Sequence, residues 1–156
     1  MLKLAGKGDN LANNLKLIQR QIDNGEGLAK FKELIEFQGG DSSCLESPEL
    51  LNMAKFRTSV RATKNGTIYE MDCKNIGQVI VNLGGGRKKK EDFIDNTIGI
   101  EVLKKIGDKV EIGDPLLYIY SNDESKAKEQ VEFLQNSYHY ADVEIPKINE
   151  IIDIIE

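Results

Sequence analysis

The sequence predicts an α+β protein in which an α-helical segment comes first and a β-rich unit with inserted helices follows. Between residues 10 and 40, apolar residues recur every three or four positions, the spacing that places them on one face of a helix. Gly-Asp pairs at 107–108 and 113–114 predict tight turns, because glycine adopts positive φ freely and aspartate bonds its own backbone. On either side of these turns the apolar spacing is two, which is typical of strands, at Ile98, Ile100 and Val102 and at Leu116, Tyr118 and Tyr120.

Composition limits the classes of protein and of partner. The chain has 156 residues, 40% of them hydrophobic and 30% charged, enough for one domain or for a domain with an attached piece. No apolar run is long enough to span a bilayer and no signal peptide is visible, so we expect a cytoplasmic protein without a membrane partner. Cys44 and Cys73 lie far apart and are expected to be free thiols. The net charge of −5 argues against nucleic acid as the main partner.

Residues 1–41 are predicted to form a helical hairpin. Met1–Gly8 resembles the last turn of an apolar helix. Asp9 or Asn10 then caps a first helix that ends at Gly25, with Leu11, Leu15, Ile18 and Ile22 on one face. A second helix covers about 28–38, with Leu28, Phe31, Leu34 and Ile35 on one face. Nothing nearby in the sequence covers both faces, so we expect their packing partner to lie outside this pair.

A linker at 42–55 and a second domain at 56–156 are predicted next. The linker has no hydrophobic period, and Pro48 disfavours helix before it. Strands are expected at 56–62 and 67–72, separated by a turn at Lys64-Asn65-Gly66. Asn75 is expected to cap a helix whose core-facing stripe is Ile76, Val79, Ile80 and Leu83.

The last third of the chain is predicted to hold a long helix and a strand. Before them, Phe93 and Ile94 are expected to anchor a short turn at 91–96. Asn122 and Asp123 cap the long helix, whose stripe is Ala127, Val131, Leu134 and Tyr138. A strand is expected at 141–145, and Pro146 breaks it. The apolar segment 148–155 fits either a strand or a helix.

The sequence offers little sign of catalytic, cofactor or metal chemistry. His139, the single histidine, has no identifiable base or nucleophile partner, and no metal-ligand spacing occurs. Arg87–Lys90 is a basic run expected to be solvated, and Asp92 and Asp95 are expected to brace the following turn. One glycine-rich turn could offer backbone N–H groups and a guanidinium to an anion, although a helix C-cap explains it as well; it comprises Gly84, Gly85, Gly86 and Arg87.

Two β segments resemble the flattened β-barrel of biotinyl and lipoyl carrier domains. They are 60–68 and 107–116. Such carriers display a lysine at a hairpin tip, flanked by methionine in the biotinyl case. Here the strand after Leu116 runs into Ser121–Glu124 and a helix, without that hairpin. The resemblance therefore implies a shared β-barrel-sandwich core, and a swinging carrier is the weakest functional interpretation.

A second resemblance covers essentially the whole chain in order. Gly84–Arg87, Asp92–Asp95 and the two Gly-Asp turns through Tyr120 resemble the C-terminal domain of pyrimidine-nucleoside phosphorylases, the thymidine phosphorylase family. Met1–Lys7 and Phe31–Asp41 resemble the stretch that precedes that domain. The resemblance implies an α/β-hammerhead, in which the Ile76–Leu83 helix is inserted into the β-barrel sandwich.

The resemblance also implies a reaction. The family is a pentosyltransferase family that cleaves uridine or thymidine with inorganic phosphate, giving a free pyrimidine and a pentose 1-phosphate. Its phosphate- and pyrimidine-binding segments lie upstream of the matched region, so no catalytic residue can be assigned here. We expect an inactive C-terminal portion that binds the upstream domains and forms one wall of the cleft, with Gly84–Arg87 facing it. Phosphate and nucleoside would bind only in the full-length homodimer. The alternative is a stand-alone, non-catalytic binding or scaffold module.

Overall fold

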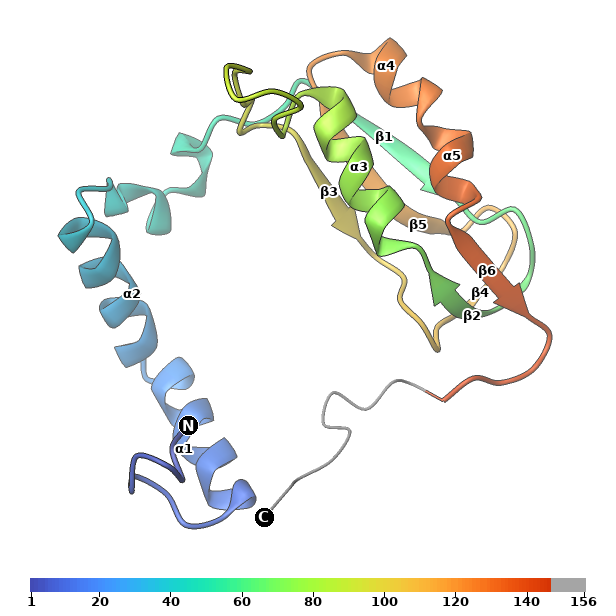
Figure 1. Cartoon of the computed structure of the whole chain (residues 1–156). Helices are drawn as coiled ribbons and strands as arrows, with labels where there is room; N and C mark the ends of the chain where they lie inside the picture. Colours follow the sequence, from blue (N-terminus) through green and yellow to red (C-terminus); the bar gives the residue numbers. More distant parts are fainter. Residues whose placement is uncertain (147–156) are drawn as a thin grey trace. The chain divides into compact units, whose positions relative to one another are not determined.

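The computed structural model describes residues 1–146 and divides the chain into two compact units. The first is Met1–Leu51 and the second begins at Asn52. Figure 1 follows both along the chain, and each is described here by itself. The predicted apolar segment at 148–155 lies outside the described residues.

Two helices dominate the first unit, α1 (Leu11–Asp23) and α2 (Glu26–Phe37). The side chain of Asn10 caps α1 by accepting a hydrogen bond from the backbone N–H of Asn13 at 2.9 Å. The predicted hairpin is wrong: α2 continues beyond α1 end to end instead of folding back along it (Figure 1). Only Asn24 and Gly25 separate the helices, and no buried contact between the two apolar stripes is present to fold them back.

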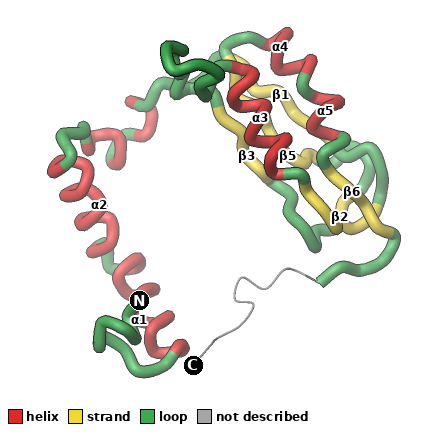
Figure 2. The backbone as a smooth tube through the Cα atoms, in the orientation of Figure 1, coloured by secondary structure: helices red, strands yellow, loops and turns green. Residues whose placement is uncertain are grey.

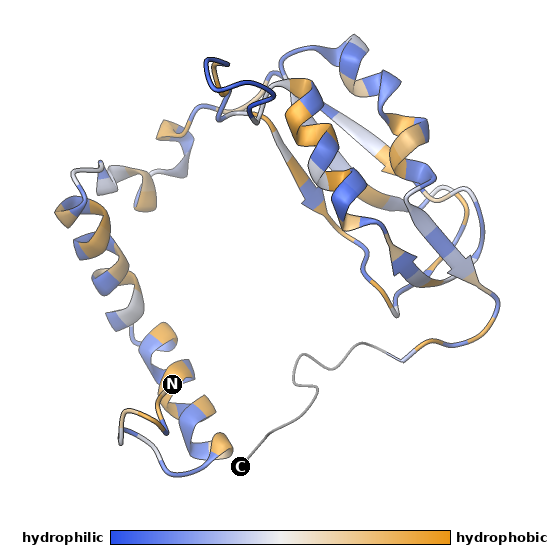
Figure 3. Cartoon of the chain, in the orientation of Figure 1, coloured by the Kyte–Doolittle hydropathy of each residue, from blue (hydrophilic) through white to orange (hydrophobic). Residues whose placement is uncertain are grey.

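Neither helix of the first unit has a buried residue. Figure 3 shows apolar patches along both ribbons, and their side chains are exposed at Leu11, Leu15, Ile18, Ile22, Leu28, Phe31 and Leu34. The predicted helical turn at 1–8 is present as one closed turn, in which the Ala5 N–H donates to the Met1 carbonyl at 2.9 Å. The expectation that α1 and α2 leave their apolar faces uncovered is therefore confirmed for the described residues.

The predicted linker contains regular structure that the sequence pattern did not indicate. Two 3-10 turns, η1 (Ser42–Leu45) and η2 (Pro48–Leu50), occupy it. Asp41 begins the first turn by accepting from the Ser43 N–H at 2.9 Å. Pro48 sits in the first position of the second turn, where its missing N–H costs no hydrogen bond.

Two three-stranded antiparallel sheets form the second unit (Figure 2). The first has the order β1-β5-β3, with β1 at Phe56–Arg61, β5 at Pro115–Ser121 and β3 at Gly99–Val102. The second has the order β4-β2-β6, with β4 at Lys109–Val110, β2 at Gly66–Met71 and β6 at Tyr138–Ala141. Consecutive strands β1 and β2 thus belong to different sheets, and the turn at 64–66 connects the sheets.

The two predicted Gly-Asp turns are confirmed. Gly107 and Gly113 adopt φ of 89° and 95°, values that a side chain would strain. Their backbone N–H groups donate to the Ile68 carbonyl at 2.8 Å and to the Ala62 carbonyl at 2.9 Å. The first turn is therefore tied to β2 and the second to the residue that follows β1. The chain passes through the first turn into β4 of the second sheet and through the second turn back to β5 of the first sheet.

The period of two at Leu116, Tyr118 and Tyr120 predicted the strand but does not mark a buried face of β5, although Leu116 itself is fully buried. Leu117 and Ile119 are fully buried, whereas Tyr118 and Tyr120 are partly exposed on the opposite face. The Arg57 guanidinium lies over the Tyr118 ring at 4.5 Å, and the Tyr120 hydroxyl donates to Glu101 at 2.7 Å. Tyrosine supplies apolar spacing in a sequence, but its ring and hydroxyl are also suited to a solvated sheet face.

The predicted helix after β2 begins earlier than expected. The helix α3 spans Cys73–Leu83, and Asp72 caps it by accepting from the Asn75 N–H at 3.0 Å. Asn75 therefore lies in the first turn and is not the cap. Ile76 and Val79 are buried in the core, as their spacing predicted.

The predicted long C-terminal helix is two short helices. They are α4 (Glu124–Glu129), capped by Asp123, and α5 (Val131–Gln135). Tyr138 belongs to β6 and not to the helix, so the strand lies three residues before the predicted 141–145. Among the described residues, the buried core of the second unit combines both sheets with α3, α4 and α5, at Val60, Ala62, Ile68, Ile76, Val79, Val110, Leu116, Leu117, Ile119, Ala127, Leu134 and Tyr138.

Candidate functional site

The glycine-rich turn Gly84–Arg87 ends α3 and opens a loop that runs to β3. Gly84 has φ of 101°, and its N–H donates to carbonyls of the last helical turn. The Gly85 N–H donates to the Ile80 carbonyl at 2.9 Å. Two of the N–H groups that an anion site would need are therefore already used to cap the helix, and Arg87 is exposed.

Close packing explains why two further glycines follow Gly84. A Cβ added at Gly85 would lie 2.8 Å from Cγ2 of Ile80 and 3.1 Å from the Ile98 side chain. A Cβ at Gly86 would lie 2.8 Å from Cγ2 of Val81. The glycines thus let the loop pass tightly over branched side chains of α3.

The Gly85→Ala variant is expected to lower the free energy of unfolding by about 1–3 kcal/mol, because branched side chains leave no room for the methyl group. Gly77→Ala, within the helix α3 that precedes Gly85, is the control. Its Cβ meets no atom within 4 Å, so it should raise stability by about 0.5–1 kcal/mol. Urea unfolding of both variants checks this. Equal effects of the two substitutions would contradict the packing role of Gly85.

The basic run after the turn is organised by an internal carboxylate. The backbone N–H groups of Lys88 and Lys89 both donate to Oδ2 of Asp92 at 2.9 Å. Asp92 therefore braces the turn before it, not the turn after it. Phe93, which was expected to anchor this segment, is 88% exposed, so that expectation is wrong. The loop presents four basic side chains, from Arg87 to Lys90, and the Phe93 ring to solvent.

A second carboxylate in the loop is the centre of a network. Oδ1 of Asp95 accepts from the Thr97 N–H at 3.0 Å and from the Thr97 hydroxyl at 2.6 Å. Oδ2 accepts from the Asn122 side-chain amide at 2.8 Å. The Asp95 N–H donates to the Gly84 carbonyl at 2.9 Å. Asp95 thus braces the following residues, as predicted, and ties the glycine-rich turn to the end of β5.

Hydrogen bonds from Thr97, reinforced by the Asn122 amide, lower the pKa of Asp95 below its ordinary value. Because the pKa is lower in the folded chain, this stabilisation is complete above the unfolded-state pKa of about 4 and is lost as the pH falls through the lower folded value. Carboxyl carbon NMR should find this lowered pKa. In Thr97→Val, which removes the hydroxyl donor, the pKa should rise toward the ordinary value. An unchanged pKa would contradict the role of Thr97.

The remaining chemistry-bearing residues are not assembled into a site. His139 lies exposed on β6, where its ring is 6.0 Å from that of Tyr69. Cys44 and Cys73 are free, as expected. Among residues 1–146 no group of three or more possible metal ligands occurs. In the same residues, no helix has the length and apolar character needed to cross a membrane.

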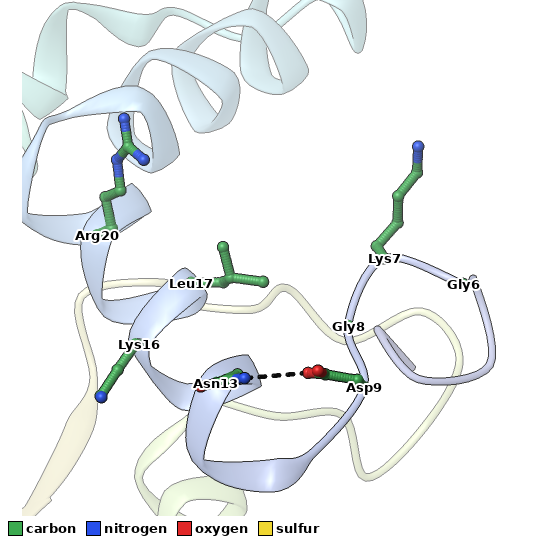
Figure 4. Close-up of a pocket in the computed structure, with 8 residues that line it drawn as sticks. All are labelled: Gly6, Lys7, Gly8, Asp9, Asn13, Lys16, Leu17 and Arg20. Atoms are coloured by element: carbon green, nitrogen blue, oxygen red, sulfur yellow. Dashed lines mark hydrogen bonds between the residues drawn. The ribbon is translucent and has the colours of Figure 1, made fainter.

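A hollow of about 730 Å³ in the first unit is lined by residues between Gly6 and Arg20. Three cationic side chains border it, Lys7, Lys16 and Arg20. Figure 4 shows Lys16 pointing away from Lys7 and Arg20, which do not converge on one point, while Asp9, the one carboxylate of the lining, is bonded to Asn13. Converging cations would be needed to hold an anion, so this hollow has no assembled binding groups.

Comparison with known proteins gives consistent matches. Residues 67–141 match the pyrimidine nucleoside phosphorylase C-terminal domain. The chain is 37% identical over 148 residues to the pyrimidine-nucleoside phosphorylase of Bacillus subtilis strain 168, which covers 95% of this chain and 34% of that enzyme. It is 41% identical over 142 residues to the Staphylococcus aureus RF122 enzyme of the same name, covering 91% of this chain and 33% of the relative.

The chain contains a pyrimidine nucleoside phosphorylase C-terminal domain. The matched segment begins in β2 and ends in β6, so it includes the whole loop between α3 and β3. It leaves out β1, although β1 pairs with β5 along its entire length. The folded unit is therefore larger than the matched segment. The chain spans about a third of the length of these curated phosphorylases.

Sequence reasoning missed Asn122 as a member of the site. It was predicted to cap the last helix together with Asp123, but the side chain of Asp123 alone caps α4. Asn122 instead bonds Asp95 and Thr97. The available signal was a surplus of capping residues, since Ser121, Asn122 and Asp123 precede one short helix that needs a single cap.

Proposed function

We propose that this chain is the C-terminal part of a pyrimidine-nucleoside phosphorylase, which converts uridine or thymidine and phosphate into a free pyrimidine and a pentose 1-phosphate. In that enzyme it forms one wall of the substrate cleft and contributes no catalytic residue. The observation that carries the proposal is the pattern of coverage. Curated phosphorylases match 95% and 91% of this chain, yet the chain spans about a third of each.

The exposed apolar stripes of α1 and α2 support the proposal that a large partner covers them. An amphipathic helix normally buries its apolar face, and contiguous exposed apolar surface indicates an interaction site. Leu15 of α1 and Phe31 of α2 are about half exposed. The part of the phosphorylase that this chain lacks is the natural occupant, because the same relatives extend far beyond the matched third.

The backbone hydrogen bonds of the loop after α3 favour a structural role in the wall of the cleft over direct phosphate binding. Phosphorolysis requires positioned donors for phosphate and for the departing base. Here Gly84 and Gly85 donate to α3, and Lys88 and Lys89 donate to Asp92. The exposed basic side chains from Arg87 to Lys90 remain available at the surface. We therefore assign Gly84–Arg87 to the cleft-facing side.

The proposed architecture is an α/β-hammerhead with a small β-barrel-sandwich core. Two three-stranded sheets that share one core and an inserted α3 support it. The proposed organisation is a tail of the upstream α/β domain at 1–41, a linker at 42–55 and the C-terminal domain at 56–156. By resemblance to the family, the assembled enzyme is proposed to be a cytoplasmic homodimer.

The direct test is an activity assay of this chain alone. With uridine or thymidine and inorganic phosphate, it should release no uracil or thymine above the uncatalysed background. The Bacillus subtilis phosphorylase serves as the positive control under the same conditions. Phosphate-dependent release by the isolated chain would contradict the assignment of catalysis to residues outside it.

A further inference from the structure

Asn122 lies at the junction of three segments of the second unit. Its Oδ1 accepts from the Lys55 N–H at 3.1 Å, just before β1 begins. Its Nδ2 donates to Oδ2 of Asp95 and to the hydroxyl of Thr97, both at 2.8 Å. Among the described residues, no other side chain bonds both the entry to β1 and the loop after α3.

The network continues from Asn122 to the glycine-rich turn. Asp95, which Asn122 holds through its side chain, donates its own N–H to the Gly84 carbonyl. Lys55 lies four residues after Leu51, where the first unit ends. A continuous path of hydrogen bonds therefore runs from the point where the chain enters the second unit to the turn at Gly84.

We propose that Asn122 is a positioning residue that fixes the position of the glycine-rich turn relative to the segment entering the second unit. Asn122 lies at a strand end and its bonds join segments that are 25 to 67 residues apart in sequence. An asparagine suits this junction because one side chain supplies both an acceptor and a donor. The relevance to catalysis rests on the proposed function, but the coupling is a property of the chain itself.

The coupling is tested by amide hydrogen exchange on the 156-residue chain, which reports local opening. In Asn122→Ala, exchange at Lys55, Asp95 and Thr97 should accelerate by about tenfold. The matched control is Asn96→Ala, because Asn96 is exposed in the same loop and has no side-chain hydrogen bond among the described residues. It should leave all three amides unchanged.

Two further variants separate positioning from local structure. Asn122→Asp keeps the acceptor for Lys55 but replaces the donor with a carboxylate facing Asp95. It should open the loop amides while Lys55 stays protected. Asp95→Ala removes no group that Lys55 contacts, yet it should accelerate exchange at Lys55 by about threefold or more, because Asn122 loses its anchor.

Protection of the sheet amide of Ile68, which donates to the Asp108 carbonyl at 3.0 Å, shows that each variant remains folded. Unchanged exchange at Lys55 in Asp95→Ala would overturn the proposal, since the two ends would then be independent. This outcome leaves the proposed phosphorylase function untouched, because no activity enters the measurement.

Discussion

Replacing Leu117 by alanine is expected to lower the free energy of unfolding of the second unit by about 3 kcal/mol. Leu117 is 0% exposed, at the centre of β5, where it pairs with Val60 on one side and Val102 on the other. The truncation would leave a cavity between both neighbouring strands and the helices that cover this face. Because both partner strands are fixed by backbone hydrogen bonds, little relaxation can fill the space.

All five tyrosines lie in the second unit, so tyrosine fluorescence during urea unfolding reports on that unit alone. Ile112→Ala is the control, because Ile112 is 66% exposed and its truncation should change stability by less than about 0.5 kcal/mol. A loss below about 1 kcal/mol for Leu117→Ala would contradict the assignment of this face of β5 to the core.

The second large effect concerns the apolar face of the first unit. Leu15→Glu is expected to weaken binding to the unmatched two thirds of the Bacillus subtilis phosphorylase by at least about a hundredfold, because a carboxylate would be buried without a partner. Phe31→Glu tests the stripe of α2 in the same way. Isothermal titration calorimetry measures both affinities.

Gln21→Glu is the matched control for Leu15→Glu. It adds the same single negative charge to an exposed position of α1 outside the apolar stripe, and glutamate is a good helix former at either position. Its affinity should stay within about threefold of the unsubstituted chain. Circular dichroism verifies that α1 remains helical in each variant. Equal losses for Leu15→Glu and Gln21→Glu would show that charge, and not the apolar face, controls binding.

Local signals predicted much of the fold. Gly107 and Gly113 adopt positive φ where a Gly-Asp turn requires it, and Ile76 and Val79 lie on the buried face that their spacing indicated. These features depend on residues close in sequence. Which residues of β5 are buried depends on partners far away in the sequence. Tyr118 and Tyr120 fit the apolar period, but they are partly exposed and contact Arg57 and Glu101. Spacing alone cannot distinguish a buried tyrosine from a solvated one.

The candidate site shows the same limit. Gly84–Arg87 was identified from its glycines, and the structure explains Gly85 through Ile80 and Ile98. The roles of Asp92 and Asn122 could not be read from the sequence, since several neighbours share their capping chemistry. The helices of the first unit were identified correctly, but their mutual arrangement was not, because the surface that would orient them is not present among the described residues.

Complementation of activity tests the central claim most directly. The unmatched two thirds of the Bacillus subtilis phosphorylase is mixed with this chain, uridine and phosphate, and uracil release is followed. The proposed function predicts no release from either part alone and phosphate-dependent release from the mixture, abolished by Leu15→Glu and retained with Gln21→Glu. Binding of the two parts without any uracil release, or no binding at all, would contradict the account.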